Sequence, residues 1–462
     1  MLSAGRIALL AGSLLAVTLH AFDELAVTTM LPVIVDELGG RALYGAVFFA
    51  YLLASLVGLV IGGGEAGRRG PATPFALGLV IFAAGLGVGA LAPSMEIVVL
   101  GRGLQGLGGG VLSATVYVVI NRSFDDHERP RVLALQASAW IVPALIAPAG
   151  AGALIASHSW RVVFAALLPL AGLALVLGLP SMRRLGPGVV ERDRREELVD
   201  GIRLAAGLGL ALFGLARPPG LLEAAGVLAG CALALPALRR ALPAGVIFAR
   251  PVLPAAVALK MLLVFAFFGT EAFVPLALIE IHGLSPMHAG LALTGAALSW
   301  TVGAHLQASW VQRFGMRALG TAGALCLVVA IAAMAAVLHP ATPTAVAFAA
   351  WGLSGLGMGI GYVTATASAM AHTPEGAEGS TSTALGVADA VAISIATGLG
   401  GAALSAADRG ALATAIPLAW VWGGMVLVAV LAGLVARRLE PRSRRPEPRA
   451  SALGPASSLP TA

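Results

Sequence analysis

The sequence predicts an all-α polytopic membrane protein, and three observations lead to that fold class. Of its 462 residues, 58% are hydrophobic and 11% are charged, and the mean hydropathy is +0.91. An ordinary soluble domain carries about 25% charged residues. Most of the apolar segments reach the roughly 20 residues needed to cross a ~30 Å hydrocarbon core. No polar stretch longer than about residues 181–200 interrupts them. Nearly the whole chain is therefore expected to lie in or against lipid.

Fourteen apolar segments are bounded by glycine, proline or clusters of charge. In chain order they are residues 7–33, 43–64, 72–93, 95–120, 132–156, 162–180, 201–216, 220–237, 254–280, 287–308, 317–338, 344–370, 380–405 and 412–436. The seventh is short for a membrane span. Without the pair at 201–237 the chain would have twelve spans and the same orientation elsewhere.

The basic residues are distributed unevenly along the chain, and only one of the 29, Lys260, is a lysine. With fourteen crossings the arginine clusters all fall on one side, which the positive-inside rule makes the cytoplasm. The clusters are Arg6; Arg68 and Arg69; Arg122, Arg129 and Arg131; Arg183 to Arg195; Arg239, Arg240 and Arg250; Arg313 and Arg317; and Arg437 to Arg449. Both termini are then cytoplasmic. The exceptions on the opposite side are Arg41, Arg161, Arg217 and Arg409.

The net charge of +6 is explained by this topology, so no nucleic-acid partner is expected. Cys231 and Cys326 lie inside apolar segments and are expected to be buried thiols, not a disulfide or a metal site. No small-x-small cleavage site precedes Asp23, so the first segment is interpreted as a span and not as a signal peptide. The proline-, serine- and arginine-rich residues 439–462 are expected to form a disordered cytoplasmic tail.

The two parts of the chain repeat one another. A tight basic turn follows the second span ("GGEAGRRGP") and also the second span of the later half ("ASWVQRFGMR"). The fourth span contains "RGLQGLGGG", and its counterpart contains "WGLSGLGMGIG". Duplication of this kind is typical of transporters. We therefore predict an N-terminal six-helix bundle (1–180), a linker with two extra helices (181–250), a C-terminal six-helix bundle (251–438) and the tail (439–462).

Four motifs in the N-terminal half resemble signatures of a known family. They are "FDELAVTTMLP" in the first span, the Arg-x-x-Gln-Gly-x-Gly pattern from Arg102 in the fourth, "APAGAG" in the fifth, and "SWRVVF" in the loop that follows. On these motifs the chain resembles the major facilitator superfamily, and within it the fourteen-span proton-driven drug antiporters. The resemblance covers almost the whole chain. It implies two pseudo-symmetric six-helix bundles plus a two-helix hairpin, which rock about a site near the bilayer midplane.

The match to these motifs is incomplete at two places. In "APAGAG", Ala147 and Ala151 replace glycines of the antiporter signature. In the loop after the second span, Gly67 stands where the family has an acid, and the nearest acid is Glu65. The resemblance implies gating or hinge roles for the following residues: Pro148, Gly152, Arg68, Arg69, Gly70, Arg313 and Gly315. A plain proline kink at Pro148 is the alternative.

Asp23 and Glu24 are two adjacent acids inside the first predicted span. A carboxylate at the centre of a lipid-embedded helix costs about 2.5 to 3.5 kcal/mol on insertion scales, so such residues face a cavity or a partner. The helix places them about 100° apart, which predicts separate roles. Counting from Ile7 puts Asp23 in the outer third of the membrane. The alternative is that both are wetted by headgroup water at the outer end of a long helix.

Arg102 is predicted to lie at the same depth as Asp23, about 10 Å from the outer end of the fourth span. An arginine there needs an anionic or carbonyl partner, and the resemblance implies that it regulates protonation of the first-span acid. The alternative is snorkelling to the outer headgroups. Gln105, one turn deeper, is expected to hydrogen-bond into the same cavity. The neighbouring glycines are expected to let helices pack closely.

Three more ionisable residues lie within predicted spans: Lys260, Glu271 and Asp389. Glu271 follows Lys260 by three helical turns, so these two are not expected to pair. Glu271 joins Asp23 and Arg102 as a candidate for proton coupling, or alternatively for binding a cationic substrate. The predicted substrate cavity consists of Glu24, Gln105, Gln136, Trp140 and Asp389. His20 and His305 are more simply interpreted as packing residues, and membrane aromatics such as Trp140 commonly have no function beyond packing.

The chain lacks a nucleotide-binding loop and any catalytic constellation, so we predict a non-enzymatic transporter without cofactor or metal, driven by an ion gradient. The predicted function is export of hydrophobic, cationic small molecules in exchange for protons across the bacterial inner membrane, by a monomer. The alternatives are export of a metabolite or lipid by the same machinery and, from another class, a non-transporting membrane receptor.

Overall fold

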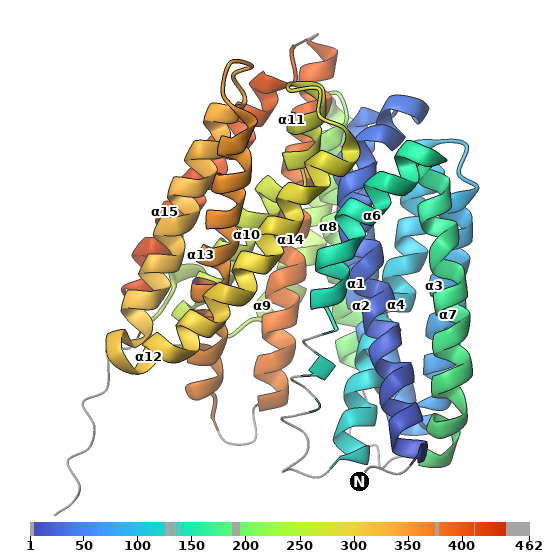
Figure 1. Cartoon of the computed structure of the whole chain (residues 1–462). Helices are drawn as coiled ribbons and strands as arrows, with labels where there is room; N and C mark the ends of the chain where they lie inside the picture. Colours follow the sequence, from blue (N-terminus) through green and yellow to red (C-terminus); the bar gives the residue numbers. More distant parts are fainter. Residues whose placement is uncertain are drawn as a thin grey trace, which may run out of the picture.

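The computed structural model describes residues 4–124, 132, 135–136, 139–186, 195–374, 378–410 and 412–439, and throughout these residues every regular element is helical. The helices form an upright bundle (Figure 1). Several predictions fall outside the described residues: Arg129 and Arg131, part of the linker (187–194) and almost all of the tail (440–462).

The N-terminal half contains six long helices. They are α1 (Ala4–Leu38), α2 (Tyr44–Arg69), α3 (Ala72–Ala90), α4 (Met95–Ser123), α6 (Ile141–Ser157) and α7 (Trp160–Met182). A hairpin of α8 (Arg195–Ala216) and α9 (Leu221–Ala241) follows. The later half has α10 (Leu253–Glu271), α11 (Val274–Glu280), α12 (Pro286–Val337), α13 (Thr344–Ala371), α14 (Glu378–Arg409) and α15 (Ala415–Ala436). Short 3-10 turns occupy Arg41–Leu43, Arg183–Leu185 and Val246–Phe248.

Twelve stretches of the described residues are long and apolar enough to cross a membrane. Two further segments run with them in the bundle, α6 and the part of α12 before Gly315, and together these are the fourteen predicted spans. The helix of the seventh predicted span is longer than expected. It is α8, which begins at Arg195, and its charged first turn was not counted as part of the apolar segment.

One predicted span is broken in the structure, and the predicted division between two other spans is a bend within one long helix. The ninth predicted span is not continuous: α10 ends at Glu271, and α11 begins at Val274 with a proline in its first turn. Proline lacks a backbone N–H and so favours such a break. Conversely, α12 joins two predicted spans across a bend, where Gly315 has φ 80° and ψ 163°. Only glycine adopts such a conformation without steric cost.

The arginines that break the predicted charge asymmetry have partners in the fold. Arg41 forms ion pairs with Glu280 (3.0 Å) and Asp408 (3.5 Å), and Arg161 pairs with Glu37 (2.5 Å). These contacts neutralise two of the four exceptional arginines locally. Arg41 lies in the 3-10 turn before α2, Glu280 ends α11 and Asp408 belongs to α14, so these pairs hold the two halves together at this end of the bundle.

The same end of the bundle is closed by tight contacts between the two halves. The Tyr44 hydroxyl donates to the Ala272 carbonyl (3.0 Å), and its ring stacks on Phe273 (5.3 Å between centroids). A Cβ on Gly45 would lie 2.3 Å from the Thr397 carbonyl oxygen, so α2 and α14 are in backbone contact. Their small interface residues permit this approach.

The predicted hinge in α6 lies at another contact between the halves. A Cβ on Gly152 would approach the Met287 Cα to 2.3 Å, and one on Gly290 would lie 2.8 Å from the Pro148 carbonyl oxygen. The proline-glycine segment of α6 therefore packs directly on the first turns of α12. The hinge role itself stays a prediction.

The internal repeat is visible in helix packing. In the first half, a Cβ on Gly106 of α4 would lie 2.0 Å from the Tyr51 carbonyl oxygen of α2. In the second half, a Cβ on Gly355 of α13 would lie 2.0 Å from the Ala296 carbonyl oxygen of α12. Both glycines occupy the same place in the repeated motif. This alignment makes Trp351 the repeat counterpart of Arg102.

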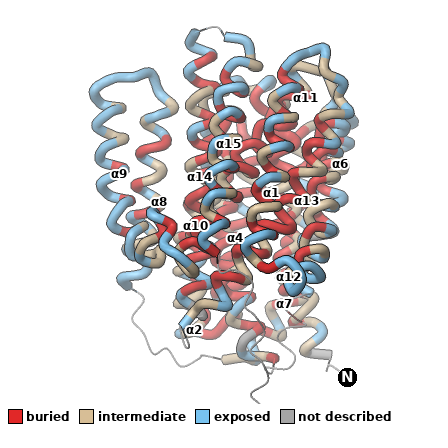
Figure 2. Tube along the Cα trace, turned by 90° about the vertical axis from the view of Figure 1, so that its left-hand side faces the viewer, coloured by how far each residue is buried: buried red, intermediate tan, exposed pale blue. Residues whose placement is uncertain are grey.

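The α8–α9 hairpin stands at the edge of the bundle, and α9 is largely exposed (Figure 2). Its two helices meet through Gly207 and Gly230, where an added Cβ would come within 2.6 Å of the opposite backbone. Leu212 of α8 packs against Gly398 of α14, and Gly209 lies near Leu53 of α2. The hairpin thus covers the seam between α2 and α14.

Candidate coupling and substrate site

Asp23 and Arg102 form an ion pair in the interior of the N-terminal half. Arg102 Nη1 lies 2.5 Å from Asp23 Oδ2, and both side chains are almost wholly buried, with 2% and 0% of their surface exposed. Arg102 therefore does not snorkel to the headgroups. Asp23 lies near the middle of the 35-residue α1, because this helix continues through Pro32 to Leu38, beyond the predicted end. The predicted depth of Asp23, in the outer third of the membrane, stays a prediction.

Arg102 makes three further contacts. Its Nη1 donates to Gln105 Oε1 (2.8 Å), its Nε donates to the Val47 carbonyl (3.3 Å), and its guanidinium lies over the Tyr51 ring at 4.0 Å from the centroid. A planar guanidinium suits this combination of hydrogen bonding and stacking. Residues from α1, α2 and α4 are therefore joined through one cation.

Two polar atoms of this cluster are buried without a hydrogen-bond partner among the described residues: Asp23 Oδ1 and Gln105 Nε2. Buried polar atoms without a partner cost free energy, and in native proteins they are uncommon. Oδ1 is the Asp23 oxygen that the arginine leaves open. A proton can add there without first displacing Arg102 from Oδ2.

His20 and Glu24 occupy the next face of α1. The Tyr51 hydroxyl hydrogen-bonds to His20 Nδ1, while His20 Nε2 lies 3.9 Å from Glu24 Oε2. The Glu24 side chain is 29% exposed, in contrast to Asp23. His20 is therefore part of a polar chain from Arg102 through Tyr51 to Glu24. The sequence analysis interpreted His20 as a packing residue; its i,i+4 spacing from Glu24 is a weak signal that could have indicated this contact.

Trp140 and Gln136, predicted for the substrate cavity, lie near the start of α6. The Trp140 indole meets the His20 ring edge-on at 5.6 Å between centroids. Trp140 is one of the exposed large hydrophobic residues, and Gln136 Oε1 is buried without a partner among the described residues. Trp140 thus packs against the histidine of this polar chain. Gln136, four residues before Trp140, has a carbonyl oxygen that can accept a hydrogen bond.

Lys260 and Asp389 form a second intramembrane ion pair, in the C-terminal half. Lys260 Nζ lies 2.9 Å from Asp389 Oδ2, and the Tyr362 hydroxyl donates to the same oxygen (3.0 Å). The Lys260 ammonium also lies over the Tyr362 ring, 4.6 Å from its centroid. Sequence reasoning identified both charged residues but not their pairing, because α10 and α14 are distant in the chain.

Glu271 lies at the end of α10, next to the Trp351 indole. The Trp351 Nε1–H group has no hydrogen-bond partner among the described residues. No ion pair to it occurs in the described part of the chain. It interacts electrostatically with Glu24 of the first half. The two acids come from different halves of the bundle.

An aromatic cluster adjoins Glu271. Phe267 stacks on Trp351 at 5.1 Å, contacts Phe268 edge-on at 5.1 Å and meets Trp300 at 5.5 Å between centroids. Trp300 in turn meets Tyr362 at 5.4 Å. The cluster connects Glu271 with the Lys260–Asp389 pair through apolar and aromatic surface.

The remaining predicted residues lie away from these acids. Arg68 and Arg69 pair with Glu65 within α2 (3.8 and 3.3 Å), and Gly70 ends that helix with φ 86°. Arg313 lies over the Phe314 ring at 5.2 Å, next to the bend at Gly315. His305 is exposed and hydrogen-bonds to the Thr301 carbonyl of its own helix (2.8 Å).

Comparison with known proteins agrees with this architecture. Residues 13–397 match the family model of the Major Facilitator Superfamily. The chain belongs to this superfamily. A bacterial homologue of the human lysosomal transporter Spinster, in an inward-facing and unoccupied conformation, has a similar fold (TM-score 0.69, 16% identity, 95% of this chain and 98% of that one). The POT family transporter PepTSo is similar too (TM-score 0.68, 15% identity, 93% and 97%).

Among curated relatives are efflux proteins. The chain is 30% identical over 305 residues to the probable multidrug-efflux transporter Rv1634 of Mycobacterium tuberculosis. The match covers 63% of this chain and 64% of that protein. It is also 30% identical over 185 residues to the multidrug transporter protein MdtP of Bacillus subtilis (39% of this chain, 34% of that protein). The chain thus matches less than two thirds of the length of these curated relatives, and its membership of the superfamily makes it a multi-pass membrane protein.

Proposed function

We propose that this superfamily member is a proton-coupled antiporter that exports hydrophobic, cationic small molecules. The main support is the buried Asp23–Arg102 pair, whose Asp23 Oδ1 has no partner among the described residues. An acid at such a site can alternate between a charged, paired form and a neutral, protonated form. Similarity to multidrug-efflux proteins supports export as the direction of transport.

Protonation of Asp23 removes the counter-charge of Arg102. An uncompensated buried charge is costly, on the order of 3–5 kcal/mol when one partner of a buried pair is lost. Arg102 contacts Val47 of α2 and Gln105 of its own helix as well as Asp23 of α1. Its rearrangement therefore shifts α1, α2 and α4 relative to one another. In this way the proton changes the preference between the two orientations of the halves.

Glu24 and Glu271 are proposed to bind the positive charge of the substrate. They come from opposite halves and interact electrostatically, so a cation between them relieves their repulsion. Trp140 lies on the Glu24 side, through its contact with His20, and the Phe267–Trp351 stack lies on the Glu271 side. Aromatic faces add affinity for apolar and cationic groups. Glu271 is also the second proposed coupling residue.

The conformation supports the alternating-access part of the proposal. The halves meet in ion pairs of Arg41, in the Tyr44–Phe273 stack and in backbone contacts of α6 with α12. All of these contacts lie at the Arg41 end, the predicted outer end. We interpret the state as closed to the outside of a bacterial inner membrane, with both termini in the cytoplasm and the chain acting as a monomer.

Proton release from purified protein tests the proposal. Adding a lipophilic cation, such as a quaternary ammonium dye, to weakly buffered protein at near-neutral pH should release protons, and Asp23→Asn should release fewer. Substrate binding without any proton release would contradict antiport. A pump-deficient host expressing the gene complements the measurement. If its resistance to dyes, quaternary ammonium compounds and antibiotics stays unchanged throughout, export of a metabolite or lipid becomes the better explanation.

A further inference from the structure

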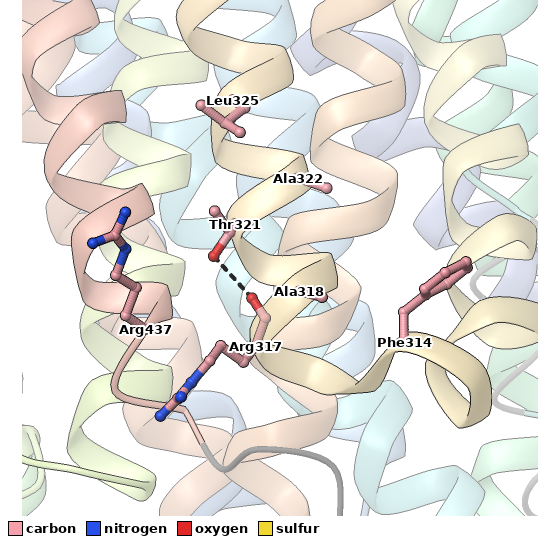
Figure 3. A pocket seen from close by; sticks show the side chains of 7 residues that line it. All are labelled: Phe314, Arg317, Ala318, Thr321, Ala322, Leu325 and Arg437. Atoms are coloured by element: carbon pink, nitrogen blue, oxygen red, sulfur yellow. Dashed lines mark hydrogen bonds between the residues drawn. The ribbon is translucent and has the colours of Figure 1, made fainter.

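A pocket in the C-terminal half is lined by none of the acids of the transport site. It has a volume of about 560 Å³ and lies between the second part of α12 and the end of α15. The lining residues are Phe314, Arg317, Ala318, Thr321, Ala322, Leu325 and Arg437 (Figure 3). The pocket thus combines two cations, one hydroxyl and an otherwise apolar wall.

Arg437 directly follows the end of α15, and Arg317 lies at the start of the second part of α12; in Figure 3 the Arg437 side chain runs upward and the Arg317 side chain runs downward. Both are exposed, and neither guanidinium makes an ion pair or hydrogen bond within the described part of the chain. The adjacent Arg438 behaves differently, because it donates to the Ala249 carbonyl (3.0 Å). Arg437 and Arg317 are therefore available to an anion from outside.

The polarity of the pocket changes along α12. Arg317 lies at the polar end of the pocket, and Thr321 lies one helical turn further along α12. Leu325 lies another turn along, about 12 Å from Arg317 along the helix axis. The hydroxyl of Thr321 donates to the Arg317 carbonyl (2.9 Å), so the chain itself satisfies this donor. The arginines remain the groups that can recognise a charged ligand.

Above the arginines, the outer faces of both helices are apolar. Leu325 and Val329 of α12 are 56% and 57% exposed, and the same surface of α15 presents Leu427, Leu431 and Leu434. Within a membrane span such exposed side chains contact acyl chains. The pocket therefore has cations at the predicted cytoplasmic surface and hydrocarbon contacts above them.

We propose that this pocket binds an anionic phospholipid of the cytoplasmic leaflet. Its phosphate would lie between Arg317 and Arg437, and one acyl chain would run along Leu325 and the leucines of α15. Arginine guanidinium groups match phosphate oxygens in geometry and charge. Basic pockets between membrane helices on the cytoplasmic side bind anionic headgroups in this manner. Arg317 follows Gly315 by two residues, so the lipid would brace the bend of α12 against α15.

Native mass spectrometry of the full chain with phosphatidylglycerol or phosphatidylcholine tests the proposal. The decisive variant is Arg317→Gln/Arg437→Gln, and the matched control is Arg183→Gln/Arg184→Gln, which removes the same charge from another exposed pair on the same predicted side. We expect the dissociation constant of the most tightly bound phosphatidylglycerol to be about 30-fold higher in the pocket variant than in the wild type. The control variant and all phosphatidylcholine binding should change little. Arg317→Lys/Arg437→Lys should retain part of the affinity.

Three results would overturn the proposal. Equal weakening by the pocket and control variants would indicate general attraction to a basic surface. Inorganic phosphate that competes with phosphatidylglycerol and stabilises the protein as well as the lipid does would identify a site for a free anion. The pocket variant could also bind lipid normally and yet be less stable to heat by the same amount with and without phosphatidylglycerol. That result would show that the arginines bind another part of the chain.

Discussion

The two halves of the bundle stabilise their membrane-embedded acids differently. In the N-terminal half, Asp23 is wholly buried and its cation is an arginine that also binds Gln105 and Tyr51. In the C-terminal half, Asp389 is 23% exposed and shares Lys260 with Tyr362. The first arrangement buries Asp23 completely, whereas the second leaves part of the Asp389 side chain exposed.

The repeated motif makes the difference sharper. Trp351 occupies the place in α13 that Arg102 occupies in α4, and it lies next to Glu271. The first-span acid of the N-terminal half therefore has a cation, and the corresponding acid of the C-terminal half has an aromatic ring. Duplicated helices thus retained the packing glycines while their charged partners diverged. We interpret this as a division between a proton site in the first half and a substrate site shared by both halves.

The largest effect is expected from Asp23→Asn. Asparagine cannot take up and release a proton, so export in everted vesicles should fall to background for cationic and neutral substrates alike. Binding of substrate should persist, because Glu24 and Glu271 are unchanged. Asp389→Asn is the matched control in the other half and should leave some coupled export. Transport of either substrate against its gradient at the wild-type rate in Asp23→Asn would refute the assignment of the proton to Asp23.

Replacement of the cation in the first half should be nearly as severe. Arg102→Ala leaves Asp23 without the group that stabilises its charged form, and we expect coupled export to be lost while protein abundance stays near normal. Arg102→Lys should rescue only in part, because lysine lacks the planar fork that reaches Gln105 and Val47. Export rates in everted vesicles, normalised to the amount of protein, measure this. Full activity in Arg102→Ala would leave the pair with a packing role only.

Replacement of Lys260 in the second half is expected to change mainly the stability of the protein. Lys260→Met leaves the carboxylate of Asp389 with the Tyr362 hydroxyl but without its cation, and should cost on the order of 1–3 kcal/mol of stability. The double variant Lys260→Met/Asp389→Asn should recover most of that loss, because neither charge is then left alone. Thermal unfolding in detergent measures both. If the double variant is as unstable as Lys260→Met, the interaction energy resides elsewhere, for instance in the Tyr362 contact.

The smallest and most selective effect is expected from Glu24→Gln. A cationic substrate loses one charge-assisted contact, worth roughly 1.5 kcal/mol, so its export should fall about tenfold. A neutral substrate of similar size should be exported as before. The two are compared in the same vesicle preparation, with Asp36→Asn, an acid nearer the outer end of α1, as the matched control. Equal loss for both substrates would show that Glu24 serves coupling and not charge recognition.

The sequence by itself determined the fold class, most of the spans and the identity of nearly all the ionisable candidates. Hydrophobicity is a local property, and a membrane requires helices of nearly fixed length, so composition and periodicity were sufficient. The glycine motif likewise predicted close helix packing, because its small residues serve that purpose wherever they occur. The division of α12 into two spans was an accurate prediction of its bend, since Gly315 lies between two apolar runs.

The predicted depth and the family resemblance already indicated Arg102 as a partner of Asp23, but only the tertiary structure decided the other charge pairs. Lys260 and Asp389 are separated by 129 positions in the chain, and Tyr51, Tyr362 and His20 gave no strong signal because hydroxyls and imidazoles are common packing residues. The break after Glu271 was also missed, because a proline close to the end of an apolar run looks like an ordinary span terminus. Charge pairing depends on helix rotation and on neighbours from distant segments, and a sequence pattern specifies only which side chains are available for it.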